Sequence, residues 1–323
     1  MMIPRSIVLL ALAGCASKPA PVSPSASDKF GVLIMAHGGT PEWNAAVAKT
    51  IEPLRAKYDV EIAFGMADAT TMQDAVKKLE SRHVGKIGVV RLFISGESWF
   101  ERTQQIFGLR EGAPPAGGDH DMHGGHGGHD MHAGMNPHAG MPPGDPAMGG
   151  HSMAFFRVAS HAAFEISTHG LADAEGMGKV LADRAKALSK DPAKEDIIIL
   201  AHGPGDDAEN ARWMEKLDHR AAEIRALAPF RRVEVATLRE DWPDKRAPAE
   251  AKVRAFVERA KAEGGTAIVL PFRVQGFGPY ADVLKGLDYI SDTQGLIPHA
   301  EVEKWIESQV AELQARPFAT PQK

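Results

Sequence analysis

One pattern of segments is written twice in this chain. An apolar run followed by a His-Gly pair occurs at His37 and again at His202. Later segments recur in the same order, and the matching pairs are 60–63 with 233–236 and 89–96 with 268–276. A recurring unit of this kind predicts a duplicated fold whose two copies pack together, with a site built between them.

Short apolar runs alternate with helix-like stretches along the chain. The expected strands are 30–35, 59–64, 86–94 and 154–159 in the first unit, and 196–200, 232–238, 266–274 and 284–290 in the second. The expected helices are 43–57, 71–82, 174–188, 208–226, 249–262 and 302–313, and we expect the helix at 174–188 to close the first unit. This alternation predicts an α/β fold of two tandem, flavodoxin-like three-layer units, each with a mostly parallel four-stranded sheet.

The composition sets limits on the organisation and on the partners. A chain of 323 residues with 44% hydrophobic content can bury a large core. We place the first unit at 29–190, with an insert at about 111–153, and the second at 191–314, and we expect the tail at 315–323 to fray. The formal net charge is −5. Basic stripes with interleaved aromatic residues do not occur, which argues against a nucleic-acid partner.

The N-terminus resembles a bacterial lipoprotein signal. Arg5 precedes an apolar run at 7–12, which is too short to span a bilayer and ends in Leu-Ala-Gly-Cys at 12–15. In such signals cleavage falls before the cysteine, whose thiol carries a lipid. Residues 1–15 are therefore expected to be the signal with its lipidation site, and 16–28 a flexible tether rich in Pro, Ser and Ala. The alternative is a chance cysteine in an ordinary export signal.

Lipidation at Cys15 would make this an exported protein, anchored in the membrane and facing the periplasm. Cys15 is also the single cysteine of the chain. A disulfide within the monomer is therefore excluded, and so is a thiolate metal site in the folded body.

The two histidines of the repeat occupy equivalent places. Ligands of open parallel sheets bind beyond the carboxyl ends of the strands, where His37 and His202 are expected to lie. A neutral imidazole at that edge can bind a divalent metal or accept a proton. The alternative is a histidine that caps the next helix or is satisfied within a turn. Two equivalent histidines in a duplicated chain favour the functional reading.

The insert is rich in metal-binding residue types. Seven of the fourteen histidines lie in it, interspersed with methionines. The candidate metal ligands are His120, His123, His126, His129, His132 and His138. Imidazoles suit copper, nickel, cobalt and zinc, and thioethers favour Cu(I). We expect this tract to be disordered without metal and to bind ions at several adaptable sites. The alternative is a low-complexity loop with incidental histidines.

The order of these segments resembles the sirohydrochlorin chelatase family. These are the class II tetrapyrrole chelatases, which insert cobalt, or iron in relatives, into a porphyrin-like ring. The resemblance rests on the apolar strand, His-Gly and later Asn of each unit, followed by Val-Glu-Ile-Ala-Phe and a strand that ends in Leu-Phe-Ile-Ser-Gly. It runs from about residue 30 to residue 313. It implies that His37 and His202 hold the metal and help to deprotonate the macrocycle.

The chain departs from that family at two places. The family usually has a second metal-binding histidine two residues after the glycine that ends strand three, where this chain has Ser98 and, in the second unit, Gly278. The acidic residue often found at the end of strand two is replaced by Met66, although Glu240 lies near the equivalent place in the second unit.

Glu97 completes the set of candidate catalytic residues with His37 and His202. It could act as a carboxylate ligand or base beside His37, as in the His/Glu pair of related chelatases. The alternative is a loop acid exposed to solvent.

Two functions remain open at this point. The first is a cobaltochelatase- or ferrochelatase-like enzyme that inserts Co, Ni or Fe into a tetrapyrrole held between the units, with the insert as the source of the ion. The second is a non-catalytic periplasmic lipoprotein that buffers Cu, Ni, Co or Zn on a chelatase scaffold. Export and the missing second histidine favour binding alone, whereas the two retained histidines favour chelation.

Overall fold

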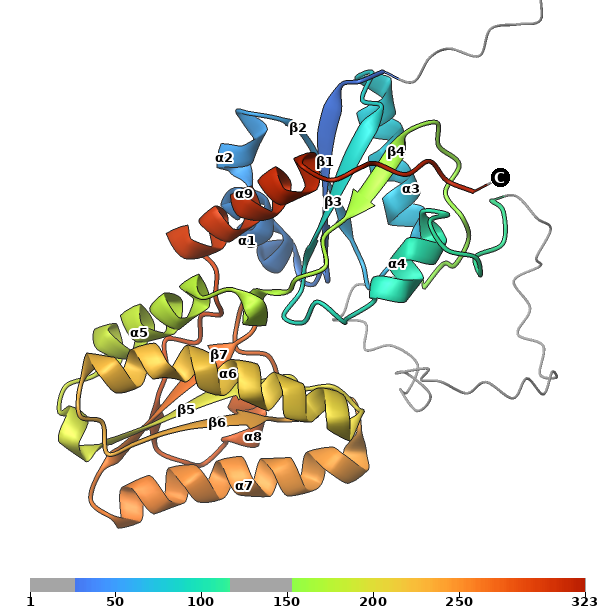
Figure 1. Cartoon of the computed structure of the whole chain (residues 1–323). Helices are drawn as coiled ribbons and strands as arrows, with labels where there is room; N and C mark the ends of the chain where they lie inside the picture. The colour runs from blue at the N-terminus through green and yellow to red at the C-terminus, as the bar shows by residue number, and fades with distance from the viewer. Residues whose placement is uncertain (1–26, 117–152, 323) are drawn as a thin grey trace, which may run out of the picture.

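The computed structural model describes residues 27–116 and 153–322. They form two lobes, each built on a four-stranded sheet in which every neighbouring pair of strands is parallel (Figure 1). The strand order is β2-β1-β3-β4 in the first lobe and β6-β5-β7-β8 in the second. The expected α/β fold of two similar units is confirmed.

The elements of the two lobes follow the same order. The strands are β1 (Phe30–Ala36), β2 (Asp59–Phe64), β3 (Lys86–Leu92) and β4 (Ala163–Ile166), then β5 (Glu195–Ala201), β6 (Arg232–Thr237), β7 (Thr266–Phe272) and β8 (Tyr289–Ile290). The helices are α1 (Pro41–Thr50), α2 (Glu52–Arg55), α3 (Ala69–Ser81), α4 (Phe100–Ile106), α5 (Gly176–Leu188), α6 (Asp207–Leu227), α7 (Pro243–Ala262), α8 (Tyr280–Val283) and α9 (Ala300–Gln314). Two 3-10 turns are η1 (Leu171–Asp173) and η2 (Pro192–Lys194).

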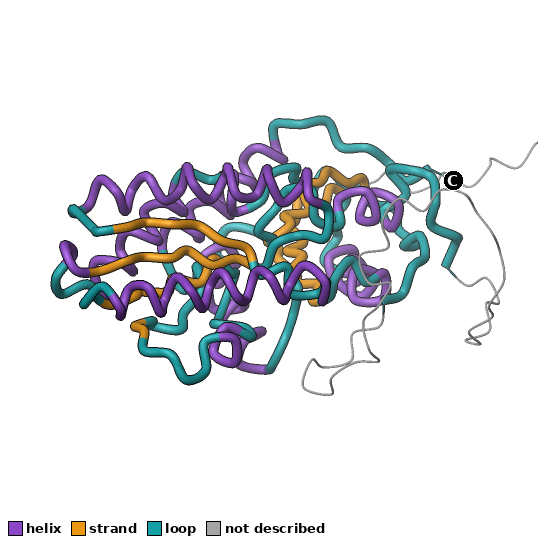
Figure 2. Tube along the Cα trace, turned by 90° about the horizontal axis from the view of Figure 1, so that it is seen from below, coloured by secondary structure: helices purple, strands orange, loops and turns teal. Residues whose placement is uncertain are grey.

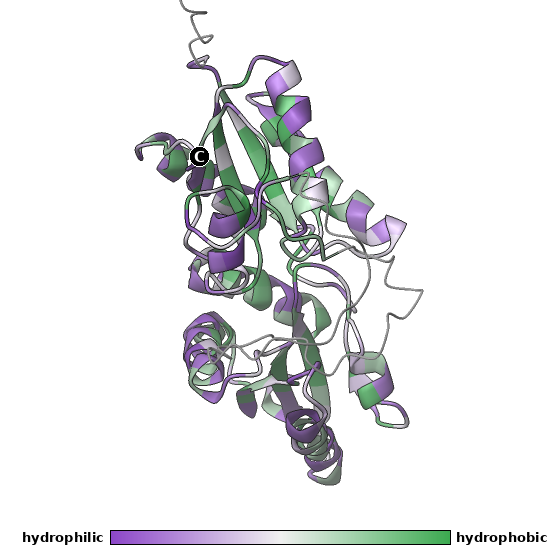
Figure 3. Cartoon of the chain, turned by 90° about the vertical axis from the view of Figure 1, so that its right-hand side faces the viewer, coloured by the Kyte–Doolittle hydropathy of each residue, from purple (hydrophilic) through white to green (hydrophobic). Residues whose placement is uncertain are grey.

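The central strand of each sheet is buried on both faces. Every residue of β5 is buried, and in β1 only the first residue is partly exposed. Helices lie on both sides of each sheet, with the apolar strands between more polar helix surfaces (Figures 2 and 3). A parallel strand covered in this way needs a continuous apolar sequence, which both repeats have. One buried cluster includes Val32 of β1 and Ile197 of β5, so the two lobes share a core.

The strand registers of the two repeats coincide. Ala36 pairs with Phe64 and Leu92, and Ala201 pairs with Thr237 and Phe272. Each of these residues is the last of its strand. The residues that follow, His37 and His202 among them, therefore lie at the carboxyl edges of their sheets, as expected.

The helices that end the two repeats are exchanged between the lobes. The helix expected at 174–188 to close the first unit, α5, packs against α6 and β7 of the second lobe, so that expectation was wrong. The last helix, α9, returns to pack against β3 and α5 (Figure 1). An amphipathic sequence predicts that a helix covers a sheet, but it does not specify which of two similar sheets.

The chain crosses between the lobes beside the ends of β3 and β7. Leu171 donates its backbone N–H to the Phe93 carbonyl at 2.9 Å, and Leu296 donates to the Arg273 carbonyl at 2.7 Å. Gly170 precedes the first contact, and a Cβ there would lie 2.5 Å from the Ile94 carbonyl oxygen. Both crossing segments therefore contact the loops that follow β3 and β7.

The fourth strand of the first lobe lies later than expected. Residues 154–159, expected as a strand, make only an isolated bridge at Arg157, and β4 is formed by 163–166 instead. The Gln73 side chain binds both the N–H and the carbonyl of Ala159, at 2.7 and 2.9 Å. These backbone groups are thus satisfied by a helix side chain, so they need no neighbouring strand.

Two further details at the end of the chain differ from expectation. The strand expected at 284–290 is reduced to the two residues of β8. The tail, expected to fray, forms an antiparallel bridge between Ala319 and Phe164 of β4, and Gln322 donates to the Gly108 carbonyl at 2.9 Å. The unpaired edge of β4 provides the backbone groups that hold the tail.

Within 27–116 and 153–322, no helix is both long enough and apolar enough to cross a membrane. The expected signal, Cys15 and most of the tether lie outside the described residues, as do the candidate ligands from His120 to His138.

Candidate functional site

His202 lies between two carboxylates at the carboxyl edge of the second sheet. Its Nδ1 is 3.1 Å from Glu240 Oε2, and its Nε2 is 3.0 Å from Asp241 Oδ2. The histidine directly follows β5, and the two acids come from the loop after β6. Gly203 has φ +78°, and a Cβ there would lie 2.5 Å from the Thr237 Cβ, so glycine is needed where the chain turns past β6.

The two acids hold this imidazole in its charged form. Burial lowers the pKa of His202, but the hydrogen bonds to Asp241 and Glu240 outweigh it and raise the pKa to about 9. Burial also acts against ionisation of Glu240, yet His202 and Arg273 hold the pKa of this carboxyl well below its usual range. At neutral pH the site therefore contains an imidazolium between two carboxylates.

Arg273 binds Glu240 and packs against the ring of Tyr280. Arg273 follows β7, and its Nη1 donates to Glu240 Oε1. Its guanidinium carbon lies 5.5 Å from the centre of the Tyr280 ring, which is completely buried at the start of α8. Burial raises the pKa of the Tyr280 hydroxyl. The row from Tyr280 through Arg273 and Glu240 to His202 thus runs from the core to the edge of the sheet.

His37 lies at the equivalent place in the first lobe, with different surroundings. Its Nδ1 is 2.8 Å from the carbonyl oxygen of Gly38, which has φ +79°. Counting three residues beyond the matched ends of β2 and β6 puts Ala67, rather than the Met66 expected from the sequence, at the place of Glu240. The acid that follows, Asp68, caps α3 by accepting from Thr70 N at 2.8 Å. The two histidines are therefore equivalent in position but differ in electrostatic environment.

Glu97 connects the two lobes. Its two carboxylate oxygens accept from Arg212 Nε and Nη2 of α6, at 2.9 and 2.5 Å. The hydrogen bond to Arg212 lowers the pKa of Glu97. Lys216, one turn further along α6, lies 2.8 Å from Asp173 of η1. The loop after β3 thereby meets the helix that follows His202.

A buried arginine shapes the loop that carries Glu97. Arg91 of β3 is 1% exposed, and its guanidinium donates to the carbonyls of Ser167, Ser98 and Gly96 at 2.9, 2.7 and 2.6 Å. It also lies 4.6 Å from the centre of the Phe100 ring. Burial lowers the pKa of Arg91 to about 10, so the side chain remains charged at neutral pH. Sequence reasoning missed this residue, although a lone charge within an apolar strand could have indicated it.

Sequence reasoning also missed Asp241 and Arg273. The signal was present, because the run Arg239-Glu240-Asp241 directly follows an apolar strand in only one repeat.

Ready-made metal sites are lacking in the described ranges. No group of three or more His, Cys, Asp or Glu side chains there is placed to hold an ion. At His202 the reason is geometric, since Glu240 and Asp241 contact opposite nitrogens of the ring. A metal ion could bind this imidazole only after displacing its proton.

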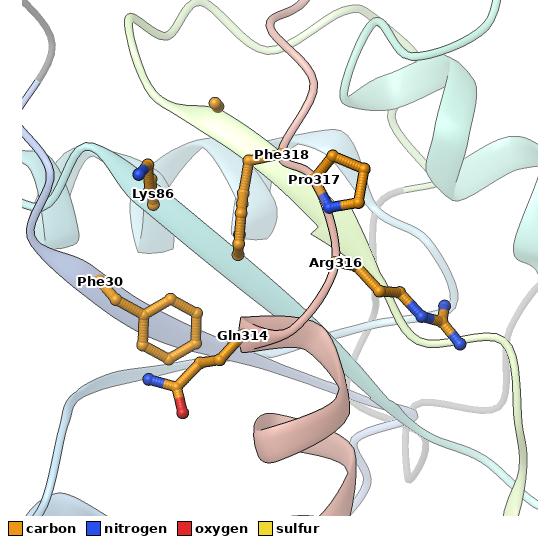
Figure 4. A pocket seen from close by; sticks show the side chains of 7 residues that line it. Phe30, Lys86, Gln314, Arg316, Pro317 and Phe318 are labelled. Atoms are coloured by element: carbon orange, nitrogen blue, oxygen red, sulfur yellow. The ribbon is translucent and has the colours of Figure 1, made fainter.

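A hollow at the opposite edge of the first sheet does not belong to this site. It has a volume of about 390 Å³ and lies at the amino ends of β1, β3 and β4 (Figure 4). Its lining residues are Phe30, Lys86, Ala163, Gln314, Arg316, Pro317 and Phe318. The parallel strands separate it from the edge that carries His37.

The fold is shared with solved chelatase structures. SirB from Bacillus subtilis with Fe3+ has a TM-score of 0.58 and 14% identity, covering 89% of this chain and 96% of that one. The sirohydrochlorin chelatase SirB from Bacillus subtilis subspecies spizizenii in complex with cobalt has a TM-score of 0.54 and 11% identity, covering 90% and 99%. The two parallel-sheet lobes of this chain thus have the fold of the solved SirB structures.

A multi-domain protein from Deinococcus radiodurans with structural similarity to chelatases also matches, at a TM-score of 0.47 and 18% identity. The match covers 90% of this chain and 55% of that one, so this chain spans about half of its length. No protein-family model matches the chain, and no curated protein has significant sequence similarity to it.

Proposed function

We propose that this protein is an exported, lipid-anchored chelatase that inserts a divalent metal, Co, Ni or Fe, into a tetrapyrrole held between its lobes. The observation that carries the proposal is the position of His202 between Glu240 and Asp241 at the carboxyl edge of a SirB-like sheet. One solved SirB structure is with Fe3+ and another is in complex with cobalt, which supports a transition-metal ion as the substrate.

The chemistry requires proton removal as well as metal delivery. Each divalent ion that enters a free-base tetrapyrrole replaces two pyrrole N–H protons, which must leave the site. His202 is charged at neutral pH and has to lose its own proton before it can accept one. Asp241, with its side chain 26% exposed, is the acid that can exchange that proton with solvent.

The divalent ion itself would favour this proton loss. Its positive charge beside Glu240 and Asp241 would compete with the imidazolium for the same carboxylates and lower the pKa of His202. His37 would act from the facing lobe, and Glu97 would be available as a ligand or base after Arg212 releases it. The histidines of the insert would supply the ion.

The second candidate is a non-catalytic periplasmic lipoprotein that buffers Cu, Ni, Co or Zn. It is favoured by the imidazolium at His202 and by Ser98 and Gly278 at the places of the expected second histidine. In that function the insert would bind the metal, and the two lobes would serve as a scaffold.

The experiment uses the protein without residues 1–15, mixed with sirohydrochlorin and Co²⁺, Ni²⁺ or Fe²⁺. Metal insertion is followed by the change of the Soret band. We expect the protein to accelerate insertion, and we expect His202→Ala to reduce the rate by about 100-fold, because proton transfer contributes factors of this order. His37→Ala should also reduce it. His219→Ala, on the exposed face of α6, is the matched control and should leave the rate unchanged.

Equal rates with and without the protein would reject the chelatase. Stoichiometric metal binding under the same conditions, lost when the insert is deleted, would then establish the buffering function.

A further inference from the structure

We propose that Arg273 is a positioning residue that fixes the orientation of the His202 ring through Glu240. This inference rests on the proposed function, since it assigns how the acting nitrogen of His202 is selected. Arg273 itself makes no contact with the imidazole among the hydrogen bonds of the described residues; it acts on the carboxylate that does.

Glu240 is held at both of its oxygens. Oε1 accepts from Arg273 Nη1, and Oε2 faces His202 Nδ1 at 3.1 Å. The Glu240 side chain is 10% exposed, so water competes little for either contact. A carboxylate clamped in this way cannot rotate without breaking a buried charged hydrogen bond, and the imidazole nitrogen that it holds is fixed with it.

The arginine is itself held in place by its surroundings. Its guanidinium lies over the Tyr280 ring, and its carbonyl accepts from Leu296 in the crossing segment. Gly278 has φ +57°, and a Cβ there would lie 2.7 Å from the guanidinium carbon. The absence of a side chain at Gly278 therefore leaves the space that the Arg273 guanidinium occupies.

The first repeat lacks both members of this pair. The register of β3 and β7 places Phe93 where the second repeat has Arg273, and the registers of β2 and β6 place Ala67 where it has Glu240. Arginine and acid thus occur together in one lobe and are both missing from the other. This pattern is expected if the role of Arg273 is to hold Glu240.

The orientation has a consequence for the chemistry. With Nδ1 held on the less exposed Glu240, Nε2 faces Asp241, whose side chain is 26% exposed. The nitrogen that exchanges protons with substrate and solvent is therefore Nε2. Loss of Arg273 would let Glu240 turn away and leave Asp241 as the one acid of this pair that holds the ring.

The test compares Arg273→Gln, Arg273→Lys and Gly278→Ala with the parent protein. The control is Arg254→Gln, which removes an arginine of the same lobe that caps the Val283 and Lys285 carbonyls. We expect Arg273→Gln and Gly278→Ala to lower kcat for cobalt insertion by about tenfold with little change in KM. Arg273→Lys should recover part of the loss, and Arg254→Gln should have no effect.

A second readout does not depend on chelatase activity. His202 is acylated with diethylpyrocarbonate, and the product is measured by peptide mass spectrometry. Acylation should become several-fold faster in Arg273→Gln, because Glu240 no longer covers Nδ1 of the ring. His37 in the same sample is the internal control. Unchanged acylation of His202 in folded Arg273→Gln and Gly278→Ala would overturn the positioning role. If the parent protein has no chelatase activity but this acylation does change, the proposed function fails and the positioning role stands.

Discussion

Arg212 in the second lobe donates two hydrogen bonds to the Glu97 carboxylate of the first lobe, at 2.9 and 2.5 Å. The acid lies in the loop after β3, and the arginine lies on the helix after His202. The contact therefore joins the loop that was expected to carry a ligand with the helix beside the second histidine. The Glu97 carboxylate is therefore paired with the positively charged guanidinium of Arg212.

Arg212→Gln should release Glu97 at little cost in stability. The two side chains are 49% and 43% exposed, and exposed ion pairs contribute at most about 1 kcal/mol. Because the Glu97 carboxylate keeps its negative charge but loses its cationic partner, we expect the affinity for Co²⁺ to rise in a variant that also lacks the insert. Isothermal calorimetry measures this affinity. Lys216→Gln, which breaks the neighbouring ion pair with Asp173 and leaves both hydrogen bonds between Arg212 and Glu97 in place, is the control. Unchanged affinity in Arg212→Gln would remove Glu97 from the candidate ligands.

The charged pair at His202 predicts how stability depends on pH. The pKa of His202 is raised from 6.5 to about 9, so the folded protein binds this proton more tightly than the unfolded chain does. The stabilisation is complete below pH 6.5 and is lost as the pH rises through 9. After allowance for solvent screening, we expect the free energy of unfolding to fall by about 1–3 kcal/mol over this range.

Urea denaturation at a series of pH values measures this loss. His202→Gln should flatten the profile above neutral pH, and His219→Gln on the exposed face of α6 should not. A parent profile without any decrease between pH 6.5 and 9 would contradict a charged His202.

The crossing between the lobes leaves no room for a side chain at Gly170. Its φ of −108° suits any residue, so the cost of substitution is steric alone. Because an added Cβ would lie 2.5 Å from the Ile94 carbonyl oxygen, Gly170→Ala should destabilise the protein by about 1–3 kcal/mol. Thermal unfolding measures the change. Gly176→Ala, whose Cβ would meet the movable end of the Glu301 side chain, is the control and should be close to neutral.

The insert should be removable without loss of the fold. Pro114 and Pro115 pair with Arg157, so the chain on either side of the insert is held together by backbone contacts. Deletion of 118–152 should therefore leave the thermal midpoint of the metal-free protein nearly unchanged and lower the number of bound Cu, Ni, Co or Zn ions. Replacement of the seven histidines by asparagine at constant length separates composition from length. A large fall in the midpoint would show that the insert is structural.

Anchoring of the proposed lipoprotein depends on a single residue. Cys15→Ala removes the thiol that would carry the lipid. We expect the incorporation of a labelled fatty acid, which the parent protein should show, to be lost in the variant, as measured by metabolic labelling and immunoprecipitation. Absence of the label from the parent protein, or equal labelling of parent and variant, would exclude the lipoprotein.

Much of the fold could be predicted from the repeat, because each strand and helix is specified by the residues of its own short segment. Largely apolar runs such as 30–35 and 196–200 favour strands covered on both faces, and their recurrence predicts two similar sheets. The positions of His37 and His202 follow from the same pattern, since a residue directly after a buried parallel strand lies at its carboxyl edge. The strand at 154–159 failed for a reason that the sequence does not contain, namely the Gln73 side chain that satisfies the Ala159 backbone.

The tertiary structure decided which parts meet. The amphipathic pattern of α5 and α9 fits either sheet, and only packing of the whole chain assigned each helix to the opposite lobe. The difference between the two histidines was also decided there, because charges far apart in sequence, such as Glu240 and Arg273, act only when the strands bring them within a few ångströms. Local periodicity therefore determined the elements and the edge that carries the histidines, whereas long-range contacts decided the helix exchange and the charge state of the site.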